Sequence, residues 1–224
     1  MTETYLAQSP VTDPGAYASW VAELPSDVSA LRDASSQLVF HHRGGGEYAQ
    51  NGVPDGRVRE IDTRYVDEML KILHGRSGAP LGTPRPASER LVGCCRDFTA
   101  LFASFARAHG IPARTRVGFA GYFMPGWWLD HVVGEIWDAE QNRWRASRNG
   151  TLDHERFVGL LTGPISETDK GLLDELAGEI SDTVDPELVG SWLRNEPLRI
   201  PEELTSYSPT SGPQQVTLRP GLAT

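Results

Sequence analysis

The chain has 224 residues, of which 39% are hydrophobic and 23% are charged, and it contains six Trp. This composition is ordinary for a globular protein, and the length suits one domain with a substantial core better than two. The formal net charge of -9 disfavours nucleic acid as a partner, because such binding depends on clustered Lys and Arg.

Membrane, secreted and metal-binding classes are also disfavoured. The sequence has no run of about 18 apolar residues, and residues 1–25 lack the basic and then apolar pattern of a secretory signal. The two cysteines, Cys94 and Cys95, are adjacent and form no disulfide framework, and the paired ligand spacing of a zinc site is missing. We therefore expect a cytoplasmic protein with no metal, no cofactor and no membrane partner.

Apolar spacing predicts three helices in the first third of the chain. One covers residues 16–23 after a turn signal, the second covers 26–39 with Ser26 or Asp27 as its cap, and the third follows Asp62-Thr63 and extends to about His74. Residues 43–57 hold five glycines and predict a mobile loop, which either covers a site or is slack.

The strongest helix prediction covers residues 95–109. Its apolar side chains recur at i, i+3, i+4 and i+7, at Phe98, Leu101, Phe102 and Phe105. Gly110 and Pro112 stop the helix. Alternating patterns then predict three strands of an antiparallel sheet, at residues 115–119, 131–137 and 143–147.

These elements predict an α+β fold in which the helix from Cys95 packs on the antiparallel sheet, with additional helices at the N-terminal and C-terminal ends. The best C-terminal helix candidates are residues 172–180 and 186–193. The last 24 residues are rich in Pro, Ser, Thr and Gly. We expect one domain over residues 1–200 and an extended tail over 201–224.

The candidate catalytic residues lie in two short segments, Gly93 to Phe98 and Asp130-His131. Cys95 stands at the start of a helix, where unpaired N–H groups and the helix dipole favour the thiolate. A histidine on a neighbouring strand, here His131, can take the thiol proton and later give it to a leaving group, as in acyl transfer by a Cys-His pair.

This arrangement resembles the transglutaminase-like superfamily, and within it the bacterial single-domain branch. The family motif G-x-C-x-D/E, followed by an aromatic residue, is matched by Gly93, Cys95, Asp97 and Phe98. The family's G-I-P-A-R element is matched by Gly110 to Arg114. Its His with an acid four residues later is matched by His131 and Glu135. The resemblance implies a papain-type fold, Cys95 as nucleophile and His131 as general base. The expected substrates are small-molecule, peptide or carrier-bound acyl groups, handled by transfer or hydrolysis, and analogy with the superfamily suggests a role in bacterial secondary metabolism.

The third member of the triad departs from the family pattern. The segment from Trp144 to Asp153 is one residue longer than the family's W-x-x-x-D-x-x-L-D, and Asn149 stands where the acid belongs. An Asn can still orient the imidazole, so the resemblance implies a triad of Cys95, His131 and Asn149. Two alternatives stay open. Either Asp138 or Asp153 orients His131, or Cys95 and His131 form a dyad without a third member. The altered segment also leaves a second class open, a catalytically weak or inactive binding protein.

The remaining candidates have ordinary structural explanations. Cys94 is expected to be a buried core residue, Asp97 a first-turn acid of the helix and Glu135 an exposed strand residue. Trp127 and Trp128 suit a cleft wall or core packing equally. The other histidines match no motif position and are expected to be structural: His41, His42, His74, His109 and His154.

Overall fold

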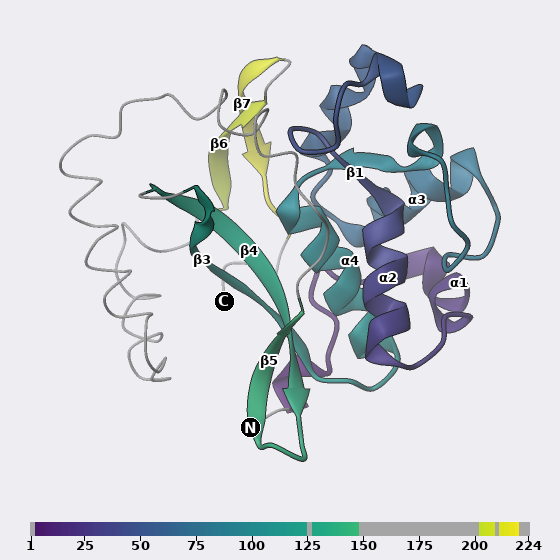
Figure 1. Cartoon of the computed structure of the whole chain (residues 1–224), viewed down its shortest axis with the longest axis vertical. Coiled ribbons are helices and arrows are strands. Elements are labelled where there is room, and N and C mark those ends of the chain that lie inside the picture. Colours follow the sequence, from purple (N-terminus) through teal and green to yellow (C-terminus); the bar gives the residue numbers. More distant parts are fainter. Residues whose placement is uncertain (1–2, 125–126, 148–201, 209–210, 220–224) are drawn as a thin grey trace.

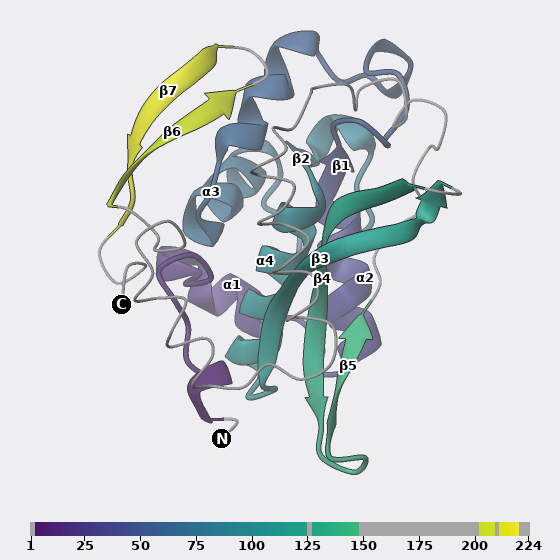
Figure 2. The ribbon, with the colours of Figure 1, turned by 90° about the vertical axis from the view of Figure 1, so that its left-hand side faces the viewer.

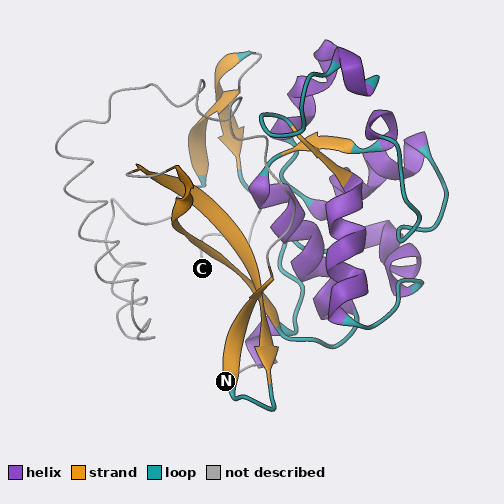
Figure 3. Ribbon diagram, viewed as in Figure 1, coloured by secondary structure: helices purple, strands orange, loops and turns teal. Residues whose placement is uncertain are grey.

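The computed structural model describes residues 3–124, 127–147, 202–208 and 211–219. The helices predicted at 172–180 and 186–193 lie outside these residues. The described chain has helices on one side and a three-stranded antiparallel sheet on the other (Figures 1 and 3), which confirms the α+β prediction. Within the described part of the chain, no helix combines the length and the apolar character needed to cross a membrane.

Within the described residues, the helical part consists of four α-helices and five short 3-10 helices. The α-helices are α1 (Ala18–Ala22), α2 (Val28–Leu38), α3 (Val66–Arg76) and α4 (Cys95–Ala108), and the 3-10 helices are η1 (Glu3–Tyr5), η2 (Gly15–Tyr17), η3 (Ala49–Asn51), η4 (Asp55–Asp62) and η5 (Ala87–Glu89). The start of α2 follows the predicted capping, because the Asp27 carboxylate accepts a hydrogen bond from the Ala30 N–H at 3.0 Å.

The helix α4 is the centre of the core. Its side chains Leu101, Phe102 and Phe105 are fully buried and pack with residues of α1, α2 and α3 in one apolar cluster. Such burial removes large apolar surfaces from water, about 2 kcal/mol for each side chain. The predicted helix over 95–109 is therefore confirmed, and its first residue, Cys95, is fixed to the most buried element.

A parallel strand pair was not expected from the sequence. The strands β1 (Val39–His41) and β2 (Leu91–Gly93) pair in parallel, with Val39 opposite Leu91 and His41 opposite Gly93. The prediction that the second helix continues to Val39 is therefore wrong by one residue, since Val39 opens β1. Its β-branched side chain suits the strand, where its partner comes from a distant part of the sequence.

The sheet consists of β3 (Ala113–Met124), β4 (Trp127–Asp138) and β5 (Arg143–Ser147) in the order β3-β4-β5, which confirms the predicted antiparallel arrangement. The β3 and β4 strands cross α4 (Figure 2). The strand β4 can approach α4 closely because Gly134 has no side chain. A Cβ there would lie 2.6 Å from Cδ1 of Phe102.

The described residues of the predicted C-terminal tail, 201–224, include two paired strands. The strands β6 (Glu203–Ser208) and β7 (Gly212–Thr217) form an antiparallel hairpin, with Leu204 opposite Val216. Gly212, at φ +69°, allows the chain to turn. After the hairpin, Arg219 lies over the Tyr65 ring at 3.8 Å and pairs with Asp67 at 3.1 Å, contacts that composition does not predict.

The contact between Gly134 and Phe102 can be tested by adding one methyl group. We expect Gly134→Ala to lower the free energy of unfolding by about 1–3 kcal/mol, because the new Cβ must displace a fully buried ring. Urea denaturation measures the loss. Gly118→Ala is the matched control in β3, since no atom lies within 4 Å of its added Cβ, and it should not destabilise the protein. Equal stability of the two variants would contradict this packing.

Candidate active site

Cys95 is held at the first residue of α4 by a tight turn. The preceding Cys94 N–H donates to Oδ2 of Asp97 at 2.8 Å, and Asp97 is only 1% exposed. A Cβ on Gly93 would lie 2.7 Å from the same Oδ2, so only glycine fits there. The motif residues Gly93 and Asp97 thus shape the turn that carries Cys95.

The turn is fixed to the segment before α3 by Arg96. Its guanidinium pairs with Asp97 at 2.8 Å and donates to the backbone carbonyls of Ile61 and Thr63 at 2.8 and 3.0 Å. Arg96 thus links the buried carboxylate of Asp97 to two backbone carbonyls near the end of η4 through charge-assisted hydrogen bonds. The expectation that Asp97 is a first-turn acid of the helix agrees with this arrangement.

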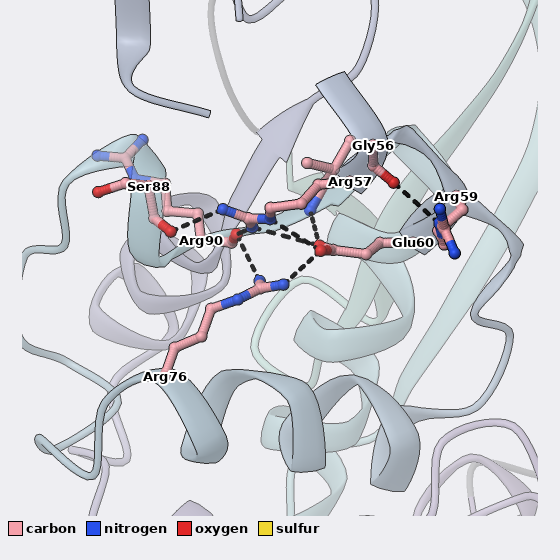
Figure 4. A network of polar contacts seen from close by, with 8 residues as sticks. Gly56, Arg57, Arg59, Glu60, Arg76, Ser88 and Arg90 are labelled. Atoms are coloured by element: carbon pink, nitrogen blue, oxygen red, sulfur yellow. Dashed lines mark hydrogen bonds and ion pairs between the residues drawn. The ribbon is translucent and has the colours of Figure 1, made fainter. Parts of the chain in front are cut away.

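The strand β2, which leads into the turn, is held by a network around Glu60 (Figure 4). The Glu60 carboxylate accepts from Arg57 Nε at 2.8 Å and from the Val92 N–H at 3.0 Å, and it also pairs with Arg76. Arg57 and Arg76 both donate to the Arg90 carbonyl. Burial opposes ionisation of Glu60, but the hydrogen bonds from Arg57, Val92 and Arg76 outweigh it and hold its pKa below the ordinary value.

The imidazole of His131, on β4, is hydrogen-bonded to the sulfur of Cys95. The pKa of Cys95 lies well below that of an ordinary thiol. The largest cause of this lowered pKa is a hydrogen bond from Cys94. Burial acts in the opposite direction, and hydrogen bonds from His131 and from the Val132 N–H lower the pKa further. The lowered pKa favours the thiolate form of Cys95, and the imidazole of His131 lies in contact with its sulfur.

Cys94, expected to be a core residue, contacts the sulfur of Cys95. Its side chain is hydrogen-bonded to Cys95, and this bond, together with burial, raises the pKa of Cys94. Cys94 therefore stays a thiol and donates its S–H to the neighbouring thiolate. Adjacency to the nucleophile was the available signal, but buried cysteines are so common that it carried little weight.

His41 was also assigned a structural role, although it belongs to this site. The charges of both Cys95 and His131 act on its ring, which is largely buried. No motif marks His41, and its place beside the helix start depends on the β1–β2 pairing. The only local signal was the glycine triplet that follows it closely.

Two acidic residues of the sheet have other partners. Glu135 is buried rather than exposed as expected, and it pairs with Arg114 at 2.7 Å and Arg116 at 3.0 Å. Asp138 lies seven residues beyond His131 in β4, a span of about 23 Å in a strand. Its carboxylate there accepts from Arg145 at 3.1 Å, so it is not positioned to orient the imidazole.

Asn149 and Asp153 lie outside the described residues, so their part in the site remains a prediction. The described end of β5 is informative, because Ser147 pairs with Gly134, three residues from His131 in β4. Trp127 and Trp128 are the first residues of β4.

A cysteine at a helix start, hydrogen-bonded to a histidine on an adjacent antiparallel sheet, is the arrangement found in papain-type cysteine proteins. Comparison with family models gave a match to the transglutaminase-like superfamily over residues 54–147. Neither the curated proteins nor the solved structures gave a match to the chain. The matched segment contains Cys95 and His131 and ends before Asn149.

Residues 54–147 are thus similar to the transglutaminase-like superfamily, and the α+β architecture agrees with the papain-type fold of that superfamily. Cysteine-based acyl transfer or hydrolysis is the chemistry to which the superfamily points.

The pairing of Cys95 and His131 predicts a distinct alkylation profile. We expect iodoacetamide to react with Cys95 well below the pH at which a free thiol reacts, because the lowered pKa keeps the thiolate at lower pH. His131→Ala removes a hydrogen bond to the sulfur, so the pKa should rise and the rate at pH 7 should fall about tenfold or more. Intact mass measured over a pH series follows the reaction, and Cys95→Ser gives the background from Cys94. A profile that does not change in His131→Ala would show that His131 does not stabilise the thiolate.

Proposed function

We propose that this protein is a cysteine-dependent acyltransferase or amidohydrolase in which Cys95 is the nucleophile, His131 the general base and Asn149 the group that orients His131. The observation that carries the proposal is the hydrogen bond between the His131 imidazole and the Cys95 sulfur at the start of α4. The lowered pKa of Cys95 supports the role of nucleophile, since the thiolate is the reactive form.

The first half of the reaction forms an acyl-thioester. The Cys95 thiolate attacks the carbonyl carbon of an amide, ester or carrier-bound thioester and gives a tetrahedral intermediate. The bond to the leaving amine, alcohol or thiol then breaks, and the His131 imidazolium supplies the proton that this group needs. The products are acylated Cys95, neutral His131 and the free leaving group.

The second half passes the acyl group on. An amine or a water molecule attacks the thioester while His131 accepts its proton, and Cys95 leaves as the thiolate. An amine gives transamidation or amide formation, and water gives hydrolysis. We propose small-molecule, peptide or carrier-bound acyl substrates and a cytoplasmic, biosynthetic setting; both cysteines are free thiols, which suits a reducing environment.

The acyl-enzyme can be trapped with an activated ester. We expect p-nitrophenyl acetate to release a burst of nitrophenolate equal to the enzyme concentration and to add one acetyl group to Cys95, because acylation precedes the slower transfer. Hydroxylamine should then remove the acetyl group as the hydroxamate. Stopped-flow absorbance and intact mass measure these steps, and Cys95→Ala should abolish both.

The same experiment separates the enzyme from an inactive binding protein. A burst that persists in Cys95→Ala would assign the chemistry to another residue. No burst in the wild type, with Cys95 labelled no faster than a free thiol, would instead favour a binding protein that retains the papain-type scaffold.

The proposal of Asn149 follows from the sequence and from where β5 ends. Asn149 is two residues beyond Ser147 in the sequence, and Ser147 pairs with Gly134, three residues from His131 in β4. Asp153 is six residues beyond Ser147 and is constrained much less. An amide oxygen that accepts the imidazole N–H would keep the second ring nitrogen directed at the sulfur.

Substitution distinguishes the candidate orienting groups. We expect Asn149→Ala to slow acylation about tenfold or more, because the imidazole is no longer oriented, and Asn149→Asp to keep or raise the rate by restoring the family's acid. Asp138→Asn is the control and should leave acylation unchanged, since Asp138 pairs with Arg145 at the far end of β4. Loss of activity in Asp153→Asn with an unaffected Asn149→Ala would assign the role to Asp153 instead.

A further inference from the structure

The proposed acyl transfer uses the sulfur of Cys95 and gives the sulfur of Cys94 no chemical step. The two side chains are hydrogen-bonded to each other, so the two sulfur atoms lie in contact. Both residues are half-buried, and both are free thiols. They are also the only cysteines among the 224 residues. The start of α4 therefore holds two neighbouring thiols, of which acyl transfer needs one.

The backbone of Cys94 is well anchored, which limits where its sulfur can lie. Its N–H donates to Oδ2 of Asp97 at 2.8 Å, and its carbonyl accepts from the N–H groups of Asp97 at 3.0 Å and Phe98 at 3.4 Å. Cys94 is extended, at φ −134° and ψ −172°, whereas Cys95 is the first helical residue. The contact between the two sulfurs thus belongs to a fixed turn.

The two sulfurs differ in how readily they lose a proton. The hydrogen bond with Cys95, together with burial, raises the pKa of Cys94. The same hydrogen bond is the largest cause that lowers the pKa of Cys95. Susceptibility to oxidants follows thiolate character and exposure, so an oxidant that enters the site reacts with Cys95 before Cys94.

We infer that Cys95 is a site of oxidation by hydroperoxides and that Cys94 is its resolving cysteine, so that the pair closes into a disulfide. In the first step the Cys95 sulfur attacks hydrogen peroxide. An S–O bond forms, the O–O bond breaks, and the departing hydroxide takes up a proton. In the second step the Cys94 sulfur attacks the sulfenic sulfur, the S–S bond forms, and the hydroxyl group leaves as water with the thiol proton of Cys94. In total, the two thiols lose two electrons and two protons, and one hydrogen peroxide becomes two water molecules.

Adjacency of the two residues makes this disulfide labile. Neighbouring Cα atoms are about 3.8 Å apart across a trans peptide, whereas most disulfides join Cα atoms about 4.4–6.8 Å apart. A disulfide between Cys94 and Cys95 is therefore strained, and strained disulfides are readily reduced. Without a resolving thiol, a sulfenic acid proceeds to the sulfinic acid, which thiols do not reduce. Cys94 thus gives the nucleophile a reversible oxidised state.

Peroxide treatment of the full chain followed by mass spectrometry tests the inference. Trypsin cuts after Arg90 and Arg96, so one peptide, residues 91–96, holds both cysteines. We expect equimolar hydrogen peroxide to lower the mass of this peptide by about 2 Da and to leave no adduct of dimedone, a reagent for sulfenic acids. Dithiothreitol should then restore both the mass and the labelling of Cys95 by iodoacetamide.

Two matched variants separate the roles of the two sulfurs. Cys94→Ser keeps a hydroxyl group beside Cys95 but cannot form the disulfide. We expect it to give the dimedone adduct or a gain of about 32 Da, the sulfinic acid, which dithiothreitol does not reverse. Products are compared instead of rates, because this substitution also changes a hydrogen bond to Cys95. Cys95→Ser leaves only the thiol of Cys94, which should stay unoxidised under the same conditions.

Each outcome decides the inference. A wild type that yields the dimedone adduct or the sulfinic acid as readily as Cys94→Ser overturns the resolving role of Cys94. A disulfide found only between two chains, seen as a doubled intact mass, overturns it as well. Oxidation of Cys95→Ser as fast as the wild type shows that Cys95 is not the site of attack.

The inference does not rest on the proposed acyl transfer, and the nitrophenolate burst tests that function separately. A Cys94–Cys95 disulfide in a protein that gives no burst supports the inference and rejects the proposed function. A burst without any disulfide after peroxide treatment does the reverse.

Discussion

The buried carboxylate of Asp97 holds the turn on which the rest of the site depends. It accepts the Cys94 N–H, faces the space left by the missing side chain of Gly93 and pairs with Arg96, which reaches the backbone before α3. A carboxylate with so little exposure is tolerated only when its charge is compensated by such partners. The same group thus fixes the helix start, the strand β2 and the segment after η4 relative to one another.

The sequence predicted those features that local patterns determine. The apolar spacing of α4, the alternation in the sheet and the stop at Gly110 are short-range signals, and the structure agrees with them. The motif around Cys95 was informative for the same reason, because Gly93 and Asp97 act within a single turn. The family match over residues 54–147 supports the superfamily that these residues suggested.

Features that depend on distant parts of the chain escaped prediction. The β1–β2 pair joins segments on either side of α3, and neither three-residue strand has a pattern long enough to be detected. The ion pairs of Glu60 with Arg57 and Arg76, and the place of His41 beside Cys95, follow from that pairing. The hairpin of β6 and β7 was missed because Pro, Ser, Thr and Gly dominate its composition, while its stabilising contacts involve Tyr65 and Asp67.

The pairing of His41 with Gly93 also bears on how the protein folds. The parallel pair joins residues about 50 positions apart in the sequence, and such long-range contacts form slowly because loop-closure entropy opposes them. The turn at Cys95 depends on β2, and the His131 contact depends on β4, which follows later in the sequence. A partly folded chain would therefore carry Cys95 as an ordinary thiol, and its reactivity would report completion of the tertiary structure. Thiol reactivity in this protein is thus a property of the fully assembled fold and a natural probe of its refolding kinetics.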